Sequence, residues 1–171
     1  MAEIKSTLDL IMEKTKNLTM TDEEKKAVHS QELRKKIKGW VQRCIDGTMN
    51  IAHLKENVQQ EMKKEPGLPA DLLEELLKKI DPEGANEVQF EIIESVLQRD
   101  TAPLKELIVQ FRVELAEKVR ERTDKEKKAL EGRNISGSAI VPNLDRDPQW
   151  KSDRKQLKES YVKRIRSATA S

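Results

Sequence analysis

The side chains that most often carry catalysis are few in this sequence. Its 171 residues include two histidines, His29 and His53, and a single cysteine, Cys44. Histidine is the usual general base near neutral pH, but both histidines fall on polar or marginal faces of predicted helices. Cys44 falls on an apolar helical face, where a buried and unreactive thiol is expected. We therefore predict that the protein is not an enzyme.

Motifs for phosphate, dinucleotide or metal binding are also missing from the sequence. There is no Gly-Lys-Ser/Thr phosphate loop and no dinucleotide fingerprint. Asp145, Asp147, Gln149 and Asp153 alternate as in a calcium loop, but the turn glycine and the closing glutamate of such a loop are lacking. Asp147 is better interpreted as a helix N-cap with Pro148 in the first turn. We expect neither a metal ion nor a cofactor.

The composition is typical of long helices. Charged residues make up 37% of the chain and aromatic residues 3%, and only six residues are glycine. Apolar residues recur three and four positions apart along most of the chain. We predict an all-α protein with a bundle of about five helices over residues 21–119. An amphipathic helix within residues 1–20 precedes the bundle. A polar helix extension and loop (120–149) and a basic C-terminal helix (150–171) follow it.

Local signals predict several helix ends. Thr21 and Glu24 form a capping box, in which each side chain binds the backbone N–H of the other residue. Asn50 and Asn86 are placed to cap the next helices, because an asparagine side chain can accept a hydrogen bond from a free N–H of the first turn. Gly47 is a natural stop, because glycine enters the left-handed region without penalty.

The segment 132–149 and the helix after it predict a docking surface. The segment contains apolar residues that are unusual in a disordered linker, and the apolar residues of the helix recur at spacings of seven, four and four. These side chains could cover the chain's own bundle, cover a second copy, or enter a groove on another protein. The candidate partner-binding residues are Ile135, Ile140, Val141, Leu144, Trp150, Leu157, Tyr161 and Ile165.

Charge is unevenly distributed, although the net charge is only +2. Residues 65–100 hold ten acids and three bases, whereas residues 150–171 hold seven bases and two acids. The alternative hypothesis is therefore a nucleic-acid- or ribosome-associated protein that binds through this basic arm. Overall neutrality counts against it, because nucleic-acid-binding domains are usually clearly basic. The cations concerned are Lys151, Arg154, Lys155, Lys158, Lys163, Arg164 and Arg166.

The location and partners follow from the same features. No apolar stretch approaches the roughly 20 residues that cross a bilayer, the first residues do not resemble a secretory signal, and a lone cysteine fits a reducing compartment. We expect a cytoplasmic protein that does not bind membranes. Apolar helical faces near both ends predict a homodimer or higher oligomer. The leading hypothesis is a non-catalytic interaction or scaffold protein that binds a still unidentified protein partner.

Overall fold

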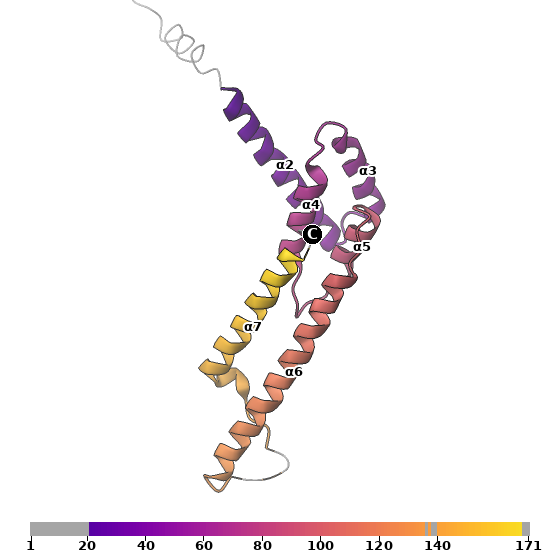
Figure 1. Cartoon of the computed structure of the whole chain (residues 1–171). Helices are drawn as coiled ribbons and strands as arrows, with labels where there is room; N and C mark the ends of the chain where they lie inside the picture. The colour runs from indigo at the N-terminus through magenta and orange to yellow at the C-terminus, as the bar shows by residue number, and fades with distance from the viewer. Residues whose placement is uncertain (1–20, 136, 138–139, 169–171) are drawn as a thin grey trace, which may run out of the picture.

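The computed structural model describes residues 21–135, 137 and 140–168, and within them the chain forms helices and no strand. The all-α prediction is confirmed for these residues, whereas the amphipathic helix predicted within residues 1–20 lies outside them. The elements, labelled as in Figure 1, are α2 (Asp22–Ile45), α3 (Ile51–Met62), α4 (Leu68–Lys79), α5 (Glu87–Ser95), α6 (Ala102–Glu131), the short 3-10 helix η1 (Leu144–Arg146) and α7 (Pro148–Ser167).

Two parts of the fold are visible in Figure 1. Helices α2 to α5 pack together as a head, and the long helix α6 leaves this head to form a hairpin with α7, which returns alongside it. The main core lies in the head, where α2 packs on α4 and both the first turns of α6 and the end of α7 join them. Its fully buried side chains include Ile37, Val41, Leu54, Leu72, Leu76, Ile92, Leu104 and Ile165.

The helix ends that depend on local signals are as predicted. The Thr21 hydroxyl accepts a hydrogen bond from the Glu24 N–H at 3.2 Å, and the Glu24 carboxylate accepts one from the Thr21 N–H at 2.8 Å. The Asn50 side chain accepts a hydrogen bond from the His53 N–H at 2.7 Å. Gly47 has a φ of 69°, the left-handed conformation expected after a helix.

Asn86 departs from its predicted role. It precedes α5, but its side chain makes no capping hydrogen bond to that helix. Its Oδ1 accepts from the Asp81 N–H at 2.9 Å, and its Nδ2 donates to the carbonyls of Asp81 at 2.8 Å and Gly84 at 3.2 Å. The buried amide therefore satisfies the backbone of the preceding turn. The capping prediction was wrong because this turn offered it more partners.

The polar stretch 120–128, part of the helix extension and loop predicted over residues 120–149, continues α6. The helix runs to Glu131 although this stretch has no apolar face. An ion pair one turn apart, with Arg122 Nη2 3.4 Å from Glu126 Oε1, gives it weak support. A second contact is made outside the helix, because Arg122 also pairs with Asp147 at the start of α7. The extension is therefore tied to the returning helix.

Candidate interaction site

The start of α7 is fixed by local sequence and by one long-range pair. Asp147 Oδ1 accepts a hydrogen bond from the Gln149 N–H at 2.9 Å, and Pro148 occupies the first turn. Burial alone would raise the pKa of Asp147, but hydrogen bonds from the N–H groups of Gln149 and Trp150 and the Arg122 guanidinium outweigh it and lower this pKa. The cap predicted at Asp147 is thus confirmed, and Arg122 attaches it to α6.

The apolar stripe of α7 is covered by the chain itself. Its four large side chains, Trp150, Leu157, Tyr161 and Ile165, are all buried. Tyr161 meets Phe111 of α6 edge to face, with ring centroids 5.4 Å apart, and its hydroxyl donates to Glu114 at 3.0 Å. Burial and this hydrogen bond raise the pKa of Tyr161. In this arrangement the stripe is not available to a partner, so the loop residues become the candidates.

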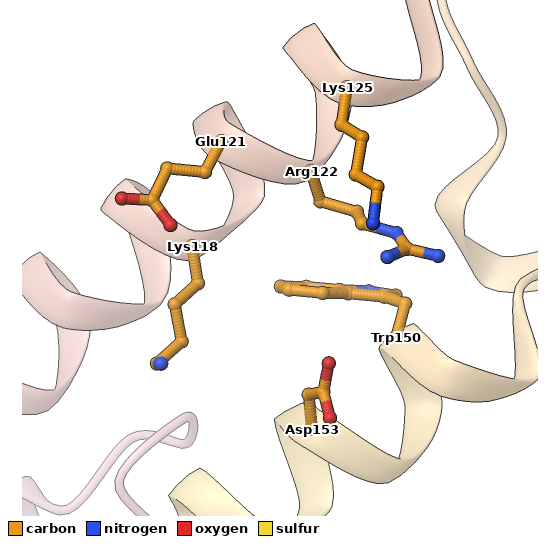
Figure 2. A pocket seen from close by; sticks show the side chains of 6 residues that line it. All are labelled: Lys118, Glu121, Arg122, Lys125, Trp150 and Asp153. Atoms are coloured by element: carbon orange, nitrogen blue, oxygen red, sulfur yellow. The ribbon is translucent and has the colours of Figure 1, made fainter. Parts of the chain in front are cut away.

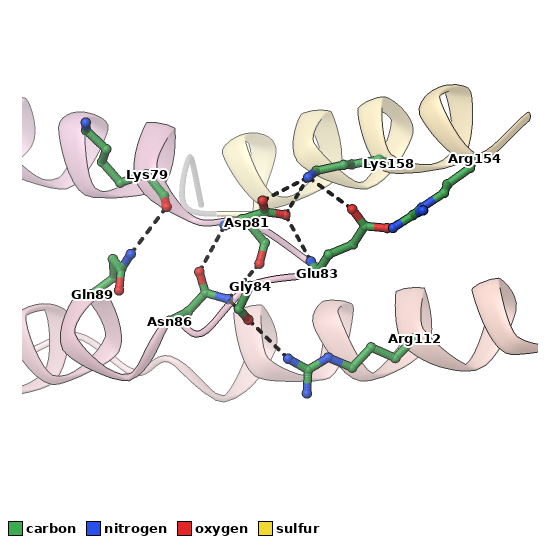
Figure 3. A network of polar contacts seen from close by, with 9 residues as sticks. All are labelled: Lys79, Asp81, Glu83, Gly84, Asn86, Gln89, Arg112, Arg154 and Lys158. Atoms are coloured by element: carbon green, nitrogen blue, oxygen red, sulfur yellow. Dashed lines mark hydrogen bonds and ion pairs between the residues drawn. The ribbon is translucent and has the colours of Figure 1, made fainter. Parts of the chain in front are cut away.

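A set of polar contacts joins α7 to the turn between α4 and α5 (Figure 3). Arg154 Nε lies 2.7 Å from Glu83 Oε1. Lys158 Nζ lies 2.8 Å from an Asp81 carboxylate oxygen and 3.2 Å from Glu83 Oε2. The same turn is held from α6, because Arg112 donates to the Gly84 carbonyl at 3.2 Å. The turn therefore connects four helices.

The carboxylates of this turn have depressed pKa values. For Asp81, burial alone would raise the pKa, but hydrogen bonds from Lys158 and the Glu83 N–H outweigh burial and lower it. For Glu83, burial is likewise outweighed by the hydrogen bonds from Arg154 and Lys158. The pKa of Lys158 is raised, first by its hydrogen bond to Asp81. Both carboxylates are therefore charged near neutral pH and neutralise cations of α7.

The seven cations proposed as nucleic-acid contacts are divided between two faces of α7. Arg154 and Lys158 are paired with the acidic turn, and Arg164 donates to Gln110 at 3.0 Å and lies over the Tyr161 ring. The remaining four side chains, Lys151, Lys155, Lys163 and Arg166, are exposed. Lys155 Nζ lies 3.9 Å from Glu159 Oε1, one turn farther along the same helix. Intramolecular contacts thus already involve Arg154, Lys158 and Arg164, and more weakly Lys155.

An open cleft of about 450 Å³ lies between the C-terminal half of α6, the loop before α7 and the first turns of α7. Three residues predicted as partner contacts, Val141, Leu144 and Trp150, are brought together there. Val141 is 82% exposed, the most exposed large apolar side chain of the described residues. The cleft is lined by Leu115, Val119, Thr123, Val141, Pro142, Asn143, Leu144, Asp145, Trp150 and Arg154. Six of these ten side chains are apolar and four are polar or charged, and we call this site the distal cleft.

Trp150 also forms one wall of a second cleft, of about 230 Å³. Figure 2 shows its indole beneath Arg122 and Lys125 of α6, with Asp153 of α7 on the other side. Lys118 and Glu121 complete a lining that is charged except for the indole. Because Trp150 is only 5% exposed, its ring face is not open for a ligand to stack on. This second cleft therefore resembles a solvated charged surface more than a binding site.

The other predicted loop residues lie near the distal cleft in sequence but do not line it. Ile135 is about half exposed and Ile140 is partly buried. Conversely, Val119 of α6 lines the distal cleft although it was not among the predicted partner contacts. The available signal was its position, because Val119 is the last apolar residue before the polar stretch 120–128. A side chain at that position lies at the rim of the cleft and is partly exposed.

The residues considered for catalysis are dispersed. His29 is exposed and its Nε2 lies 2.6 Å from Glu65, whereas His53 is exposed in the first turn of α3. Cys44 is buried, and burial raises the pKa of its thiol. Over residues 21–135, 137 and 140–168 no group of three or more histidine, cysteine or acidic side chains is arranged to hold a metal ion. None of the helices in these ranges has the length and apolar character to cross a bilayer.

Comparison with known proteins adds no family to this description. The chain matches no protein-family model, and neither the curated proteins nor the solved structures contain a significant match to it.

Proposed function

We propose that the protein is a non-catalytic interaction protein, and that the distal cleft binds a short apolar segment of another protein. The observation that carries the proposal is the exposure of Val141 in a cleft lined mainly by apolar side chains. An exposed valine at the rim of an apolar cleft gains free energy when a partner covers both.

The shape and polarity of the distal cleft support a peptide segment as its occupant. Its volume falls within the range of about 300–1,000 Å³ that is usual for ligand sites. The apolar surface continues outward to Val141 rather than ending inside an enclosed cavity. The lining contains one acid, Asp145, and one base, Arg154, so it offers no net charge to a charged ligand.

The contacts of α7 favour a protein partner over nucleic acid. A nucleic-acid surface needs unpaired cations that can replace the counterions of phosphates. Arg154 and Lys158 already neutralise Glu83 and Asp81, and Arg164 is held by Gln110 and Tyr161. Some of the basic side chains that suggested nucleic-acid binding thus attach α7 to its own bundle.

The test compares the full-length chain with a variant in the cleft. Wild-type, Val141→Asp and Gln156→Asp chains are used to capture partners from nuclease-treated extracts of the source cells. Gln156 is the matched control, because it is exposed on α7 and lies outside the cleft lining. A captured protein is then purified and its affinity for each variant is measured by calorimetry at two salt concentrations.

We expect Val141→Asp to weaken binding by at least about tenfold, because a carboxylate would be desolvated against apolar walls. Gln156→Asp should bind like the wild type. Equal affinity of all three chains would refute the site, as would the absence of any partner. Binding that requires nucleic acid and weakens steeply with salt would favour the alternative hypothesis instead.

A further inference from the structure

Helix α6 carries an apolar strip on the side that faces away from α7. Val109 is 58% exposed and Val113 is 53% exposed, and the next residue of the strip, Ala116, is exposed too. Spacings of four and three residues place these side chains on one face of the helix. The opposite face holds the buried Leu104 and Phe111. No described element covers the strip, so about two turns of α6 present apolar side chains to solvent.

Opposite charges border the two edges of this strip. Helical geometry places Lys105 and Arg112 along one edge and Glu106 and Glu117 along the other. Lys105 is paired with Glu94 at 2.7 Å. The other three charges have no opposite charge as a partner among the described residues, since Arg112 contacts a backbone carbonyl and Glu106 a neutral amide. The face is therefore apolar in the middle, basic on one side and acidic on the other.

We propose that this face binds a second copy of the chain, with the two α6 helices lying side by side in the same direction. A two-fold axis parallel to the helices brings the acidic edge of each copy against the basic edge of the other. An antiparallel pair would set acid against acid and base against base, because its two-fold axis keeps each edge on its own side. Charge complementarity thus selects both the occupant and its orientation.

The size of the face predicts a reversible dimer. The face runs from Lys105 to Glu117, which are 13 residues of α6 and therefore about 20 Å of helix. A contact band about 10 Å wide along it would bury about 200 Å² per copy, or about 400 Å² in total. Stable interfaces usually exceed about 1,000 Å², so the dimer should dissociate on dilution.

The first measurement is sedimentation velocity of the full-length chain over about a hundredfold range of concentration. We expect a monomer–dimer equilibrium that Val113→Lys weakens by at least about tenfold, because two ammonium groups would meet near the centre of the strip. Gln156→Lys on the outer face of α7 is the control and should leave the equilibrium unchanged. A chain that stays monomeric, or a dimer that Val113→Lys leaves intact, would overturn the proposal.

The second measurement tests orientation. In a Cys44→Ser background, Val109→Cys should form a disulfide between copies under mild oxidation, because parallel helices place identical residues opposite each other. Gln156→Cys should form none above the background of random collisions. If Val109→Cys instead links only to Ala116→Cys in a mixture of the two variants, the helices are antiparallel and the proposed orientation is wrong. Since Val141 is unchanged in all these variants, their outcome is independent of partner binding at the distal cleft.

Discussion

Ile165 gives the most direct test of whether α7 is a structural part of the bundle. Its side chain is 1% exposed and belongs to the main core of the head, although it lies near the end of the last helix. Ile165→Ala removes buried methyl groups and leaves a cavity, which typically costs about 2–5 kcal/mol of the free energy of unfolding. A loss of about 3 kcal/mol would lower Tm by about 6–12 °C in a chain of this length.

The assay is urea unfolding followed by circular dichroism, with calorimetry for Tm. The matched control is Lys163→Ala, two residues away on the exposed side of the same helix, which should change the free energy of unfolding by less than about 0.5 kcal/mol. If both substitutions had the same small effect, α7 would not be docked on the head in solution. The stripe would then be available to a partner, as one interpretation of the sequence allowed.

Three further predictions concern the polar contacts and the thiol. Because the folded-state pKa values of Asp81 and Glu83 are depressed, their contribution to stability is present above about pH 5 and is lost as the pH falls toward about 3. Urea midpoints should therefore depend less on pH over this window in Lys158→Ala than in the wild type, and equal slopes would contradict this assignment. Asn86→Ala should lower the free energy of unfolding by about 1–3 kcal/mol, because it leaves buried backbone groups of the turn unpaired; a neutral result in urea unfolding would show that water replaces the amide. Cys44 should react slowly with a thiol reagent in the native protein and quickly in urea, and fast native labelling would show that the thiol is not buried.

The features that could be predicted from the sequence are those in which a residue acts on its near neighbours. The Thr21 capping box, the Asn50 cap and the left-handed Gly47 all depend on a few residues around them. The Asp147 cap is of the same kind, and the structure shows all four. Each of them involves free backbone groups of a helix end, and such groups must find partners wherever the helix is placed in the fold.

Long-range contacts were harder to predict, because the sequence does not give their partners. Asn86 has the residue type of a cap, but the turn at Asp81 competed for its side chain. Arg154 and Lys158 have the pattern of a basic surface, yet residues more than seventy positions earlier in the chain neutralise them. For the distal cleft, the sequence predicted Val141, Leu144 and Trp150 without their α6 neighbours. A pattern shows which face of a helix is apolar or charged, whereas the fold decides what that face meets.

A dimer that presents two distal clefts would bind a partner with two apolar segments more tightly than a single chain would. The α6 residues that line the distal cleft, Leu115, Val119 and Thr123, lie in the part of the helix that leads away from the head (Figure 1). In a dimer with parallel α6 helices both clefts would therefore lie at the same end of the assembly, whereas an antiparallel dimer would place them at opposite ends. A partner with two apolar segments could then occupy both clefts, and its second segment would bind at a high effective concentration. Val113→Lys should therefore weaken the binding of such a partner although Val113 does not line the cleft, and it should leave the affinity for a single isolated segment unchanged. An equal loss for both ligands would show that Val113 acts on the cleft itself.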